Sequence, residues 1–212
     1  MKKNILSLTA IAMIASATIF TGCKKDDTTA PVVTIVGGDQ TISLQGTYTE
    51  LGATADDDKD GAITPTISGT VDVNHTGVYV ITYMAMDAAG NEGTAVRNVT
   101  VKNDVDAMTG GYTCTIVGVT ASYQQTITAS PTLNKRILFS KFGNYANNTG
   151  IYADIIGTTI TLPSQTALNI GSPAANITFA GTGATVTGGF GLNYTEVNTA
   201  GTLNTVENFV KN

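Results

Sequence analysis

The sequence lacks tryptophan and has one histidine, two cysteines and only 13% charged residues in 212 positions. A single histidine cannot build a multi-histidine metal site. With 16 acidic against 11 basic residues and an isoelectric point near 4.6, the chain also lacks the clustered lysine and arginine that binding to phosphate backbones requires. The composition therefore excludes nucleic acid as a partner, whereas 42% apolar residues are enough for one or two packed domains.

A long apolar run occurs only at the N-terminus, where residues 5–20 follow two lysines. This layout predicts a secretory signal peptide over residues 1–22, and the run is too short to favour a membrane-spanning helix. It ends at Phe20-Thr21-Gly22-Cys23, which resembles the lipobox of bacterial lipoproteins, with phenylalanine in place of the usual leucine. The resemblance implies that Cys23 is acylated and anchors the protein in the outer membrane, since two acyl chains suffice for lasting attachment. An ordinary signal peptide with an incidental cysteine is the alternative.

Residues 23–30 are expected to form the acylated cysteine and a linker. Lys24, Lys25, Asp26 and Asp27 resemble the charged stretch that directs Bacteroidota lipoproteins to the cell surface, and a solvated linker is the alternative. The Asp-Thr pair that ends at Thr28 resembles a short motif O-glycosylated in the same bacteria, and an unmodified linker is equally consistent with it. Removal of the signal peptide takes away two lysines, so the mature chain has 9 basic and 16 acidic residues and a net charge of −7. Its attachment to a membrane must therefore be covalent rather than electrostatic.

The rest of the chain has many short, Thr-rich and β-branched runs separated by Gly, Asn, Asp and Pro, a pattern that predicts an all-β protein. In the first half the expected strands are residues 32–36, 41–44, 53–55, 63–71, 78–86 and 95–101. The clearest of these alternates, with Tyr79, Ile81, Tyr83 and Ala85 on one face. We expect that face to lie in the core.

Three segments of the first half resemble one bacterial immunoglobulin-like (Ig-like) family. They are APVVTI at 30–35, GTYTELGATAD at 46–56 and GVYVITYMAMDAAGN at 77–91. They keep the order and spacing of the Ig-like repeat that occurs in many bacterial surface proteins and is named from an insecticidal crystal protein. The resemblance implies an Ig-like β-sandwich over residues 31–102 that serves as a stalk, spacer or adhesion module and brings no catalytic residues.

An acidic loop, DDDKDG, departs from this resemblance at residues 56–61. Its alternate acids resemble the start of a calcium loop, but an EF-hand is excluded because isoleucine stands at the twelfth position and a proline precludes the helix that should follow. A weaker prediction is a calcium ion at the pole of the sandwich, bound by Asp56, Asp58, Asp60 and Asp87. A solvated acidic turn, without any cofactor, is the interpretation that we favour.

The second half, residues 106–212, is expected to be an antiparallel β domain that closes as a barrel or a sandwich. Its expected strands are residues 112–120, 124–129, 136–142, 151–156, 159–163, 176–180, 184–188, 190–197 and 203–210. Segments 139–145 and 157–165 resemble a module that recurs behind Ig-like domains in Bacteroidota lipoproteins of undefined activity. Cys114 lies in an alternating run, which predicts a buried thiol without a disulfide partner.

Tyrosines are the aromatic residues from which the second half could form a ligand platform. Those that qualify are Tyr123, Tyr145, Tyr152 and Tyr194, although any of them could instead pack in the core. A glycan and a surface protein are the candidate partners. The absence of tryptophan disfavours the glycan, because sugar platforms stack exposed aromatic rings on the sugar.

Catalysis finds little support in the sequence. A glycoside hydrolase would need two carboxylates, and the second half offers Asp106, Asp154, Glu196 and Glu207 without a motif around any pair. We therefore expect no enzyme. The prediction is a noncatalytic surface lipoprotein whose Ig-like spacer presents a C-terminal β domain to a glycan or protein, with a purely structural or adhesive envelope lipoprotein as the alternative.

The lipid anchor can be tested by substitution. Cys23→Ala removes the only thiol next to the signal peptide, so the variant should be released into the medium or remain unprocessed. Cell fractionation and immunoblotting measure this, with Cys114→Ala as the control that keeps the acylated residue. Retention of processed Cys23→Ala in the membrane fraction would contradict acylation at this residue.

Overall fold

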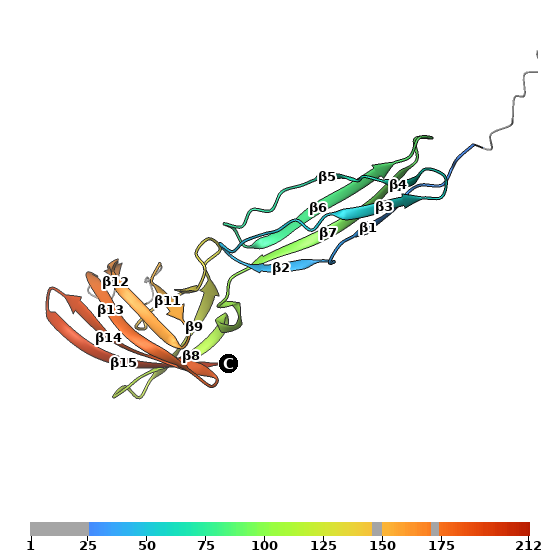
Figure 1. Ribbon diagram of the computed structural model, residues 1–212. Helices are drawn as coiled ribbons and strands as arrows, with labels where there is room; N and C mark the ends of the chain where they lie inside the picture. Colours follow the sequence, from blue (N-terminus) through green and yellow to red (C-terminus); the bar gives the residue numbers. More distant parts are fainter. Residues whose placement is uncertain (1–25, 146–149, 171–173) are drawn as a thin grey trace, which may run out of the picture.

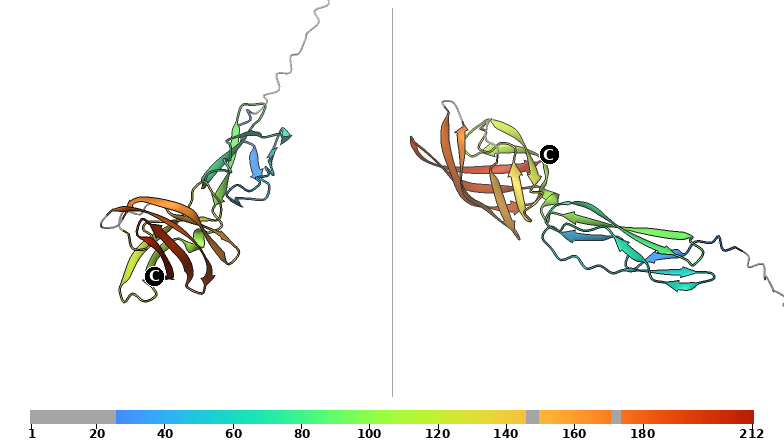
Figure 2. Two further views of the ribbon diagram at one scale, coloured as in Figure 1. Left: turned by 90° about the vertical axis from the view of Figure 1, so that its left-hand side faces the viewer. Right: turned by 90° about the horizontal axis from the view of Figure 1, so that it is seen from above.

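The computed structural model describes residues 26–145, 150–170 and 174–212, which form two β domains in tandem (Figure 1). The first domain contains two sheets and the second is a closed barrel, so the expected all-β fold class is confirmed. The domains lie end to end, and the N-terminal segment joins the first domain at the end away from the barrel (Figures 1 and 2). Cys23, Lys24 and Lys25 lie outside the described residues. In the described part of the chain, no helix has the length and apolar character needed to cross a membrane.

The first domain is a sandwich within residues 26–105, all of which the structure describes. One sheet has the order β1-β3-β4, with the bounds β1 Val32–Ile35, β3 Ala53–Asp57 and β4 Gly61–Ile63. The other has the order β2-β7-β6-β5, with the bounds β2 Gln40–Ser43, β7 Glu92–Lys102, β6 Gly77–Met86 and β5 Thr66–Ser68. Neighbouring strands are antiparallel except β2 and β7, which run parallel.

The core between these sheets follows the alternation of β6. Ile81, Tyr83 and Ala85 are at most 3% exposed, whereas Val80 on the opposite face is 50% exposed. Tyr79 is partly buried against the same core. The predicted core face of this strand is confirmed, because alternate side chains of a strand point to opposite faces of its sheet.

A buried arginine joins the two sheets. Arg97 on β7 is fully buried, and its guanidinium donates to the backbone carbonyls of Val36 and Gly52, which adjoin β1 and β3. It also pairs with Glu50, whose carboxylate accepts the hydroxyl of Tyr83 at 2.5 Å. Burial acts to raise the pKa of Glu50, but hydrogen bonds from the neighbouring tyrosines, a backbone amide and Arg97 outweigh it and lower the pKa to about 2. The ion pair therefore stays charged at neutral pH and links the sheets through partnered polar groups.

Residues 63–71 differ from the prediction of a single strand. They form the end of β4 and the separate strand β5, which belong to different sheets. Pro65 lies between the two strands and has no backbone N–H to donate to a ladder. The apolar pattern continues through this proline, but the hydrogen-bonded pairing does not.

The second domain is a closed antiparallel barrel of eight strands in the described chain, in which β15 pairs with β8. The strand bounds are β8 Gly110–Ile116, β9 Ser122–Ala129, β10 Arg136–Phe139, β11 Tyr152–Ile156, β12 Thr159–Ile170, β13 Ala175–Val186, β14 Gly189–Asn198 and β15 Gly201–Lys211. Each strand pairs with its neighbours in sequence, so the predicted meander is confirmed. Of the two closures left open by the sequence, the barrel is the one formed.

Strand β13 is continuous where the sequence predicts two strands, 176–180 and 184–188. The residues interpreted as a break include Gly181 and Gly183. A Cβ atom at Gly181 would lie 2.3 Å from the backbone oxygen of Asn193, and one at Gly183 would lie 2.0 Å from that of Gly191. These glycines therefore allow β13 and β14 to approach closely rather than ending the strand.

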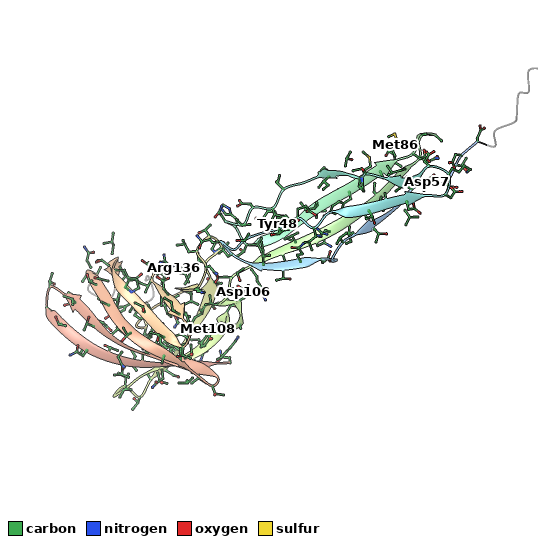
Figure 3. All side chains as sticks on the ribbon, viewed as in Figure 1. Tyr48, Asp57, Met86, Asp106, Met108 and Arg136 are labelled. Atoms are coloured by element: carbon green, nitrogen blue, oxygen red, sulfur yellow. The ribbon has the colours of Figure 1, made fainter. Side chains whose placement is uncertain are left out.

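Aromatic rings fill the half of the barrel interior nearest the sandwich. Phe190 and Phe209 stack with their centroids 4.3 Å apart, and the rings of Tyr112 and Phe139 pack within 6 Å of this pair. The Tyr112 hydroxyl donates to the carbonyl of Met108, in the 3-10 helix η1 Asp106–Met108 between the domains (Figure 3). Packed side chains thus occupy this end of the barrel.

A buried asparagine holds the barrel against the sandwich. Asn103 follows β7 and is 1% exposed; its amide donates to the carbonyls of Ser130 at 2.8 Å and Leu133 at 2.9 Å, in the turn between β9 and β10. Its Oδ1 accepts the backbone N–H of Lys135 at 2.8 Å. One side chain therefore satisfies three backbone groups of a barrel turn.

Further hydrogen bonds run from the sandwich to the same turn, among them a pair between Asp104 and Asn134: the backbone N–H of Asp104 donates to Oδ1 of Asn134 at 2.9 Å, and Nδ2 of Asn134 donates to Oδ2 of Asp104 at 3.0 Å. The backbone N–H of Thr76 donates to the carbonyl of Pro131 at 2.9 Å, and the backbone N–H of Asn134 donates to Oε1 of Gln45 at 3.2 Å. Together with the Asn103 bonds, they fix the direction in which the barrel extends from the sandwich.

Substitution of Asn103 tests this junction. Asn103→Ala leaves the partners of its amide unsatisfied, each at a cost of about 1–3 kcal/mol if they stay buried. We expect a broader range of domain orientations, seen as increased flexibility in small-angle X-ray scattering, and faster proteolysis between the domains. Asn98→Ala is the matched control, because Asn98 lies on β7 shortly before Asn103 and bonds Asp39 within the sandwich. Equal scattering from both variants would contradict the role of Asn103.

Candidate functional site

The barrel interior contains a buried glutamate held by two tyrosines. Glu207 on β15 is fully buried; Oε1 accepts the hydroxyl of Tyr123 from β9, and Oε2 accepts that of Tyr194 from β14 at 2.9 Å. β14 and β15 are neighbours in the closed barrel, and β9 lies one strand further along, beyond β8. Strand alternation places Glu207 on the same face as Phe209, and Tyr194 on the same face as Phe190.

The environment of Glu207 favours its neutral form. Burial raises the pKa of Glu207 from its ordinary value of 4.5 to about 7, partly opposed by the two tyrosine hydroxyls, while the nearby charge of Glu196 raises it further. Burial and the same carboxylate also raise the pKa of Tyr123 and of Tyr194, so both hydroxyls keep their protons. The group is a proton-holding cluster in a region shielded from water.

A second tyrosine and carboxylate pair lies closer to one end of the barrel. Glu196, 6% exposed and near the end of β14, accepts the hydroxyl of Tyr145 at 2.8 Å and that of Thr205 at 3.2 Å. Tyr145 and Glu196 line a surface depression of about 230 Å³, together with residues of the β14–β15 turn. This volume is below the roughly 300–1,000 Å³ of typical small-molecule pockets, so the depression suits one ring or one side chain rather than a large ligand.

The topology places this depression at the end of the barrel away from the sandwich. The β9–β10 turn contacts the sandwich, and alternate turns of an up-and-down barrel lie at the same end. The turns after β8 and β14 therefore lie at the opposite end (Figure 1). Along β14 and β15 the interior changes from stacked phenylalanines near the sandwich to carboxylates and hydroxyls towards the outer end.

The cysteine of the barrel is part of this interior. Cys114 is fully buried, and burial raises the pKa of its thiol to about 12. Gln125 donates from Nε2 to the Cys114 sulfur at 3.3 Å, and among the described residues its buried Oε1 has no hydrogen-bond partner. The prediction of a buried thiol is confirmed, and this thiol is not an activated nucleophile.

The predicted tyrosine platform is not assembled on one exposed surface. Tyr123 and Tyr194 are 8% and 3% exposed and bond Glu207 inside the barrel, so their prediction as exposed platform residues is wrong. Tyr152 lies on the outer wall, where the guanidinium of Arg136 covers its ring at 3.6 Å. Tyr145 is the one of the four that reaches the outer end. Strand alternation directs the first two inward, a signal that the sequence already contained.

The four carboxylates considered for catalysis are divided between different places. Asp106 lies in η1 at the domain junction, and Asp154 forms a bidentate pair with Arg136 on the barrel wall. Glu196 and Glu207 are both buried inside the barrel, where each accepts tyrosine hydroxyls. The structure thus brings Glu196 and Glu207 together inside the barrel, which no motif in the sequence indicates.

The carboxylates that meet at the pole of the sandwich differ from the predicted set. Asp27, Asp57 and Asp87 converge there, so Asp87 alone is shared with the prediction. Asp56 and Asp58 are exposed. Strand alternation explains why Asp57 replaces Asp56 in the cluster: Ala55 and Asp57 point into the sandwich from β3, whereas Asp56 points outward.

The remaining predicted residues lie in the N-terminal segment or on exposed turns. Asp60 is exposed and accepts the backbone N–H of Ala88 at 2.6 Å. Asp26 and Thr28 are exposed. Asp27, in contrast, is docked on the sandwich, where its carboxylate pairs with Lys59 at 2.9 Å. The expected linker therefore contacts the first domain from Asp27 onward.

Comparison with known proteins supports the Ig-like resemblance of the first half. Residues 34–101 match the family model described as bacterial surface protein, Ig-like domain. No curated protein sequence matches the chain.

The solved structures that match the chain are distant from it in sequence. One is the crystal structure of a lipoprotein from Bacteroides thetaiotaomicron, with 18% identity, a TM-score of 0.35 and coverage of 86% of this chain and 100% of that one. Another contains the CBM51-2 and INT domains of Clostridium perfringens ZmpB with GlcNAc; the identity is 14%, the TM-score 0.29, and the coverage 85% of this chain and 43% of that one.

The buried Glu207 predicts a pH dependence of stability. Because the folded chain holds the Glu207 carboxyl proton more tightly than the unfolded chain, protonation of Glu207 stabilises the fold. This contribution to the free energy of unfolding is fully present below about pH 4.5 and is lost as the pH rises through about 7, by about 3 kcal/mol. Urea unfolding of wild type and Glu207→Gln at pH 5 and pH 8 measures the effect, which the variant should lack. Glu92→Gln, at an exposed position of the sandwich, is the control. Identical pH dependence of stability in wild type and Glu207→Gln would refute the assignment of this effect to Glu207.

Proposed function

We propose that this protein is a noncatalytic lipoprotein exposed on the bacterial surface, anchored in the outer membrane through Cys23. In this proposal the Ig-like domain is a spacer, and the outer end of the barrel binds a glycan or a protein partner. The match of residues 34–101 to a bacterial surface Ig-like domain supports the location.

The observation that carries the proposal is the order and direction of the two domains. The N-terminal segment joins the sandwich at one end, and the barrel extends from the other (Figure 1). Hydrogen bonds from Asn103, Thr76 and Gln45 to one barrel turn hold this arrangement. A chain anchored at its N-terminus would therefore present the opposite end of the barrel furthest from the membrane, as expected of a spacer that presents a binding module.

The chemistry of the outer end suits recognition of polar groups. Tyr145 and Glu196 offer a hydroxyl, a carboxylate and a ring edge beside a shallow depression, and a carboxylate there can accept hydrogen bonds from sugar hydroxyls or peptide N–H groups. Both carboxylates of the interior already accept tyrosine hydroxyls. This engagement supports a binding role over glycoside hydrolysis, in which one carboxylate must be free to attack or to activate water.

Ligand binding at the outer end can be tested directly. The full chain, purified in detergent, is applied to a glycan array and to pull-down from isolated cell envelopes, and the affinity for any ligand found is measured. Tyr145→Ala should weaken binding roughly tenfold or more, about 1.4 kcal/mol, because it removes the ring and frees Glu196.

Tyr152→Ala is the matched control, since Tyr152 lies on the outer wall beneath Arg136. Loss of binding in this control with retention in Tyr145→Ala would move the site to the wall and contradict the proposal. Absence of any ligand in both screens would favour the structural or adhesive alternative.

A further inference from the structure

Three aspartates meet at the end of the sandwich where the N-terminal segment joins it. Asp27 comes from that segment, Asp57 from the end of β3, and Asp87 from the turn between β6 and β7. One oxygen from each lies within 4.8 Å of the others, and Asp57 and Asp87 are only 5% and 6% exposed. Figure 3 shows Asp57 at this end, next to Met86. The fold thus gathers three carboxylates from distant positions into a largely buried place.

One oxygen of this cluster lacks a partner. Oδ1 of Asp57 accepts the backbone N–H groups of Lys59 and Asp60, each at 2.9 Å. Oδ2 of Asp57 is buried and has no hydrogen-bond partner among the described residues. A carboxylate oxygen that is removed from water without compensation is costly, by one to several kcal/mol. A buried oxygen of this kind indicates that a cationic ligand completes the group.

The positive charge beside the cluster does not balance it. Lys59 contacts Asp27 at 2.9 Å and Asp58 at 3.7 Å, and its side chain is 44% exposed. This single charge stands against three converging carboxylates and the neighbouring Asp58. The cluster therefore keeps an excess of negative charge that a divalent cation would neutralise.

Hydrogen bonds orient the other members of the cluster. Asp87 accepts the backbone N–H groups of Ala89 and Asn91 on Oδ1 and the side-chain amide of Asn91 on Oδ2. The same amide donates to the backbone carbonyl of Asp27 at 3.1 Å. Asn91 thus positions Asp87 and the N-terminal segment together, as residues around a metal site orient its ligands.

We propose that Asp27, Asp57 and Asp87 bind a calcium ion at this pole of the sandwich. Calcium prefers carboxylate oxygens at 2.3–2.6 Å, so two oxygens on one ion can lie up to about 4.6–5.2 Å apart. The observed separations fit this limit without rearrangement. Magnesium binds at about 2.0–2.1 Å, so two of its oxygen ligands can lie at most about 4.2 Å apart, and it demands near-ideal octahedral geometry that three fixed carboxylates suit less well than the flexible coordination of calcium. Water supplies the remaining ligands on the exposed side.

The ion fastens the N-terminal segment to the sandwich. Asp27 precedes the first strand, whereas Asp57 and Asp87 belong to β3 and to the β6–β7 turn, so the ion cross-links the segment that follows the predicted anchor to both sheets. Calcium therefore sets how the spacer leaves the membrane. This role is independent of any ligand at the outer end of the barrel.

Calcium titration of the full chain, purified in detergent, tests the site. Isothermal titration calorimetry should detect binding, and calcium should raise the unfolding temperature of wild type by several degrees relative to chelator, because a ligand specific to the folded state stabilises it. Asp57→Asn should weaken binding at least tenfold and abolish the temperature shift. Asp56→Asn is the matched control, since it removes an exposed carboxylate one position away and should leave both values unchanged.

Several outcomes would overturn the assignment. They are equal unfolding temperatures in calcium and chelator, equal stabilisation by magnesium, and loss of binding in Asp56→Asn as large as in Asp57→Asn. If Asp57→Asn does not fold, Asp27→Asn replaces it, because Asp27 lies outside the strands of the sandwich. Unchanged calcium affinity in Asp27→Asn would then refute the site.

Discussion

The hydrogen bonds of the Asn103 side chain are the contact on which the arrangement of the whole molecule depends. An asparagine amide has two N–H donors and an oxygen that accepts up to two hydrogen bonds. A single barrel turn takes both donors through the carbonyls of Ser130 and Leu133 and gives the oxygen the N–H of Lys135, while the backbone N–H of Val105 donates to the same oxygen at 3.3 Å. Because the residue is buried, breaking this set leaves polar groups without water. Together with the bonds from Thr76 and Gln45 to the same turn, this side chain fixes the orientation of two domains that have separate cores.

Buried polar groups with defined hydrogen-bond partners also lie inside each domain. In the sandwich, Arg97 is enclosed by backbone carbonyls and Glu50, and these polar contacts join the two sheets. In the barrel, Glu207 is enclosed by Tyr123 and Tyr194, and burial raises its pKa to about 7. Such groups contribute little net stability when satisfied, but they specify one packing because any other arrangement leaves them unpaired. Aromatic rings pack along the whole interior, with Phe190 and Phe209 nearer the sandwich and Phe142, Phe179 and Tyr194 beside the carboxylates towards the outer end.

Much of the fold could be predicted from local patterns. The all-β class, the core face of β6 and the buried Cys114 follow from alternation alone and are confirmed. The predictions of the calcium ligands and of the tyrosine platform did not follow this alternation along the strands. Alternation from Ala55 points Asp57 inward, and alternation from Phe209 and Phe190 points Glu207 and Tyr194 inward. The break predicted in β13 was wrong because glycine marks a turn in one context and a close approach of two strands in another. The close approach of Gly181 to the backbone of Asn193 on the next strand is not visible in the sequence around the glycine, so local sequence does not distinguish the two cases.

Local chemistry was therefore sufficient for the class of fold, the direction of most side chains and the likeness of the first half to a bacterial surface Ig-like domain. It was not sufficient for the closure of the barrel, which depends on β15 pairing with β8 across nearly the whole domain. Nor was it sufficient for the meeting of Asp27 with Asp57 and Asp87, which are 30 and 60 positions away in sequence, or of Tyr145 with Glu196, which are 51 positions apart. The physical reason is that periodicity reports which face of a strand a residue occupies, whereas the neighbours across that face are set by strand order and register in the folded chain.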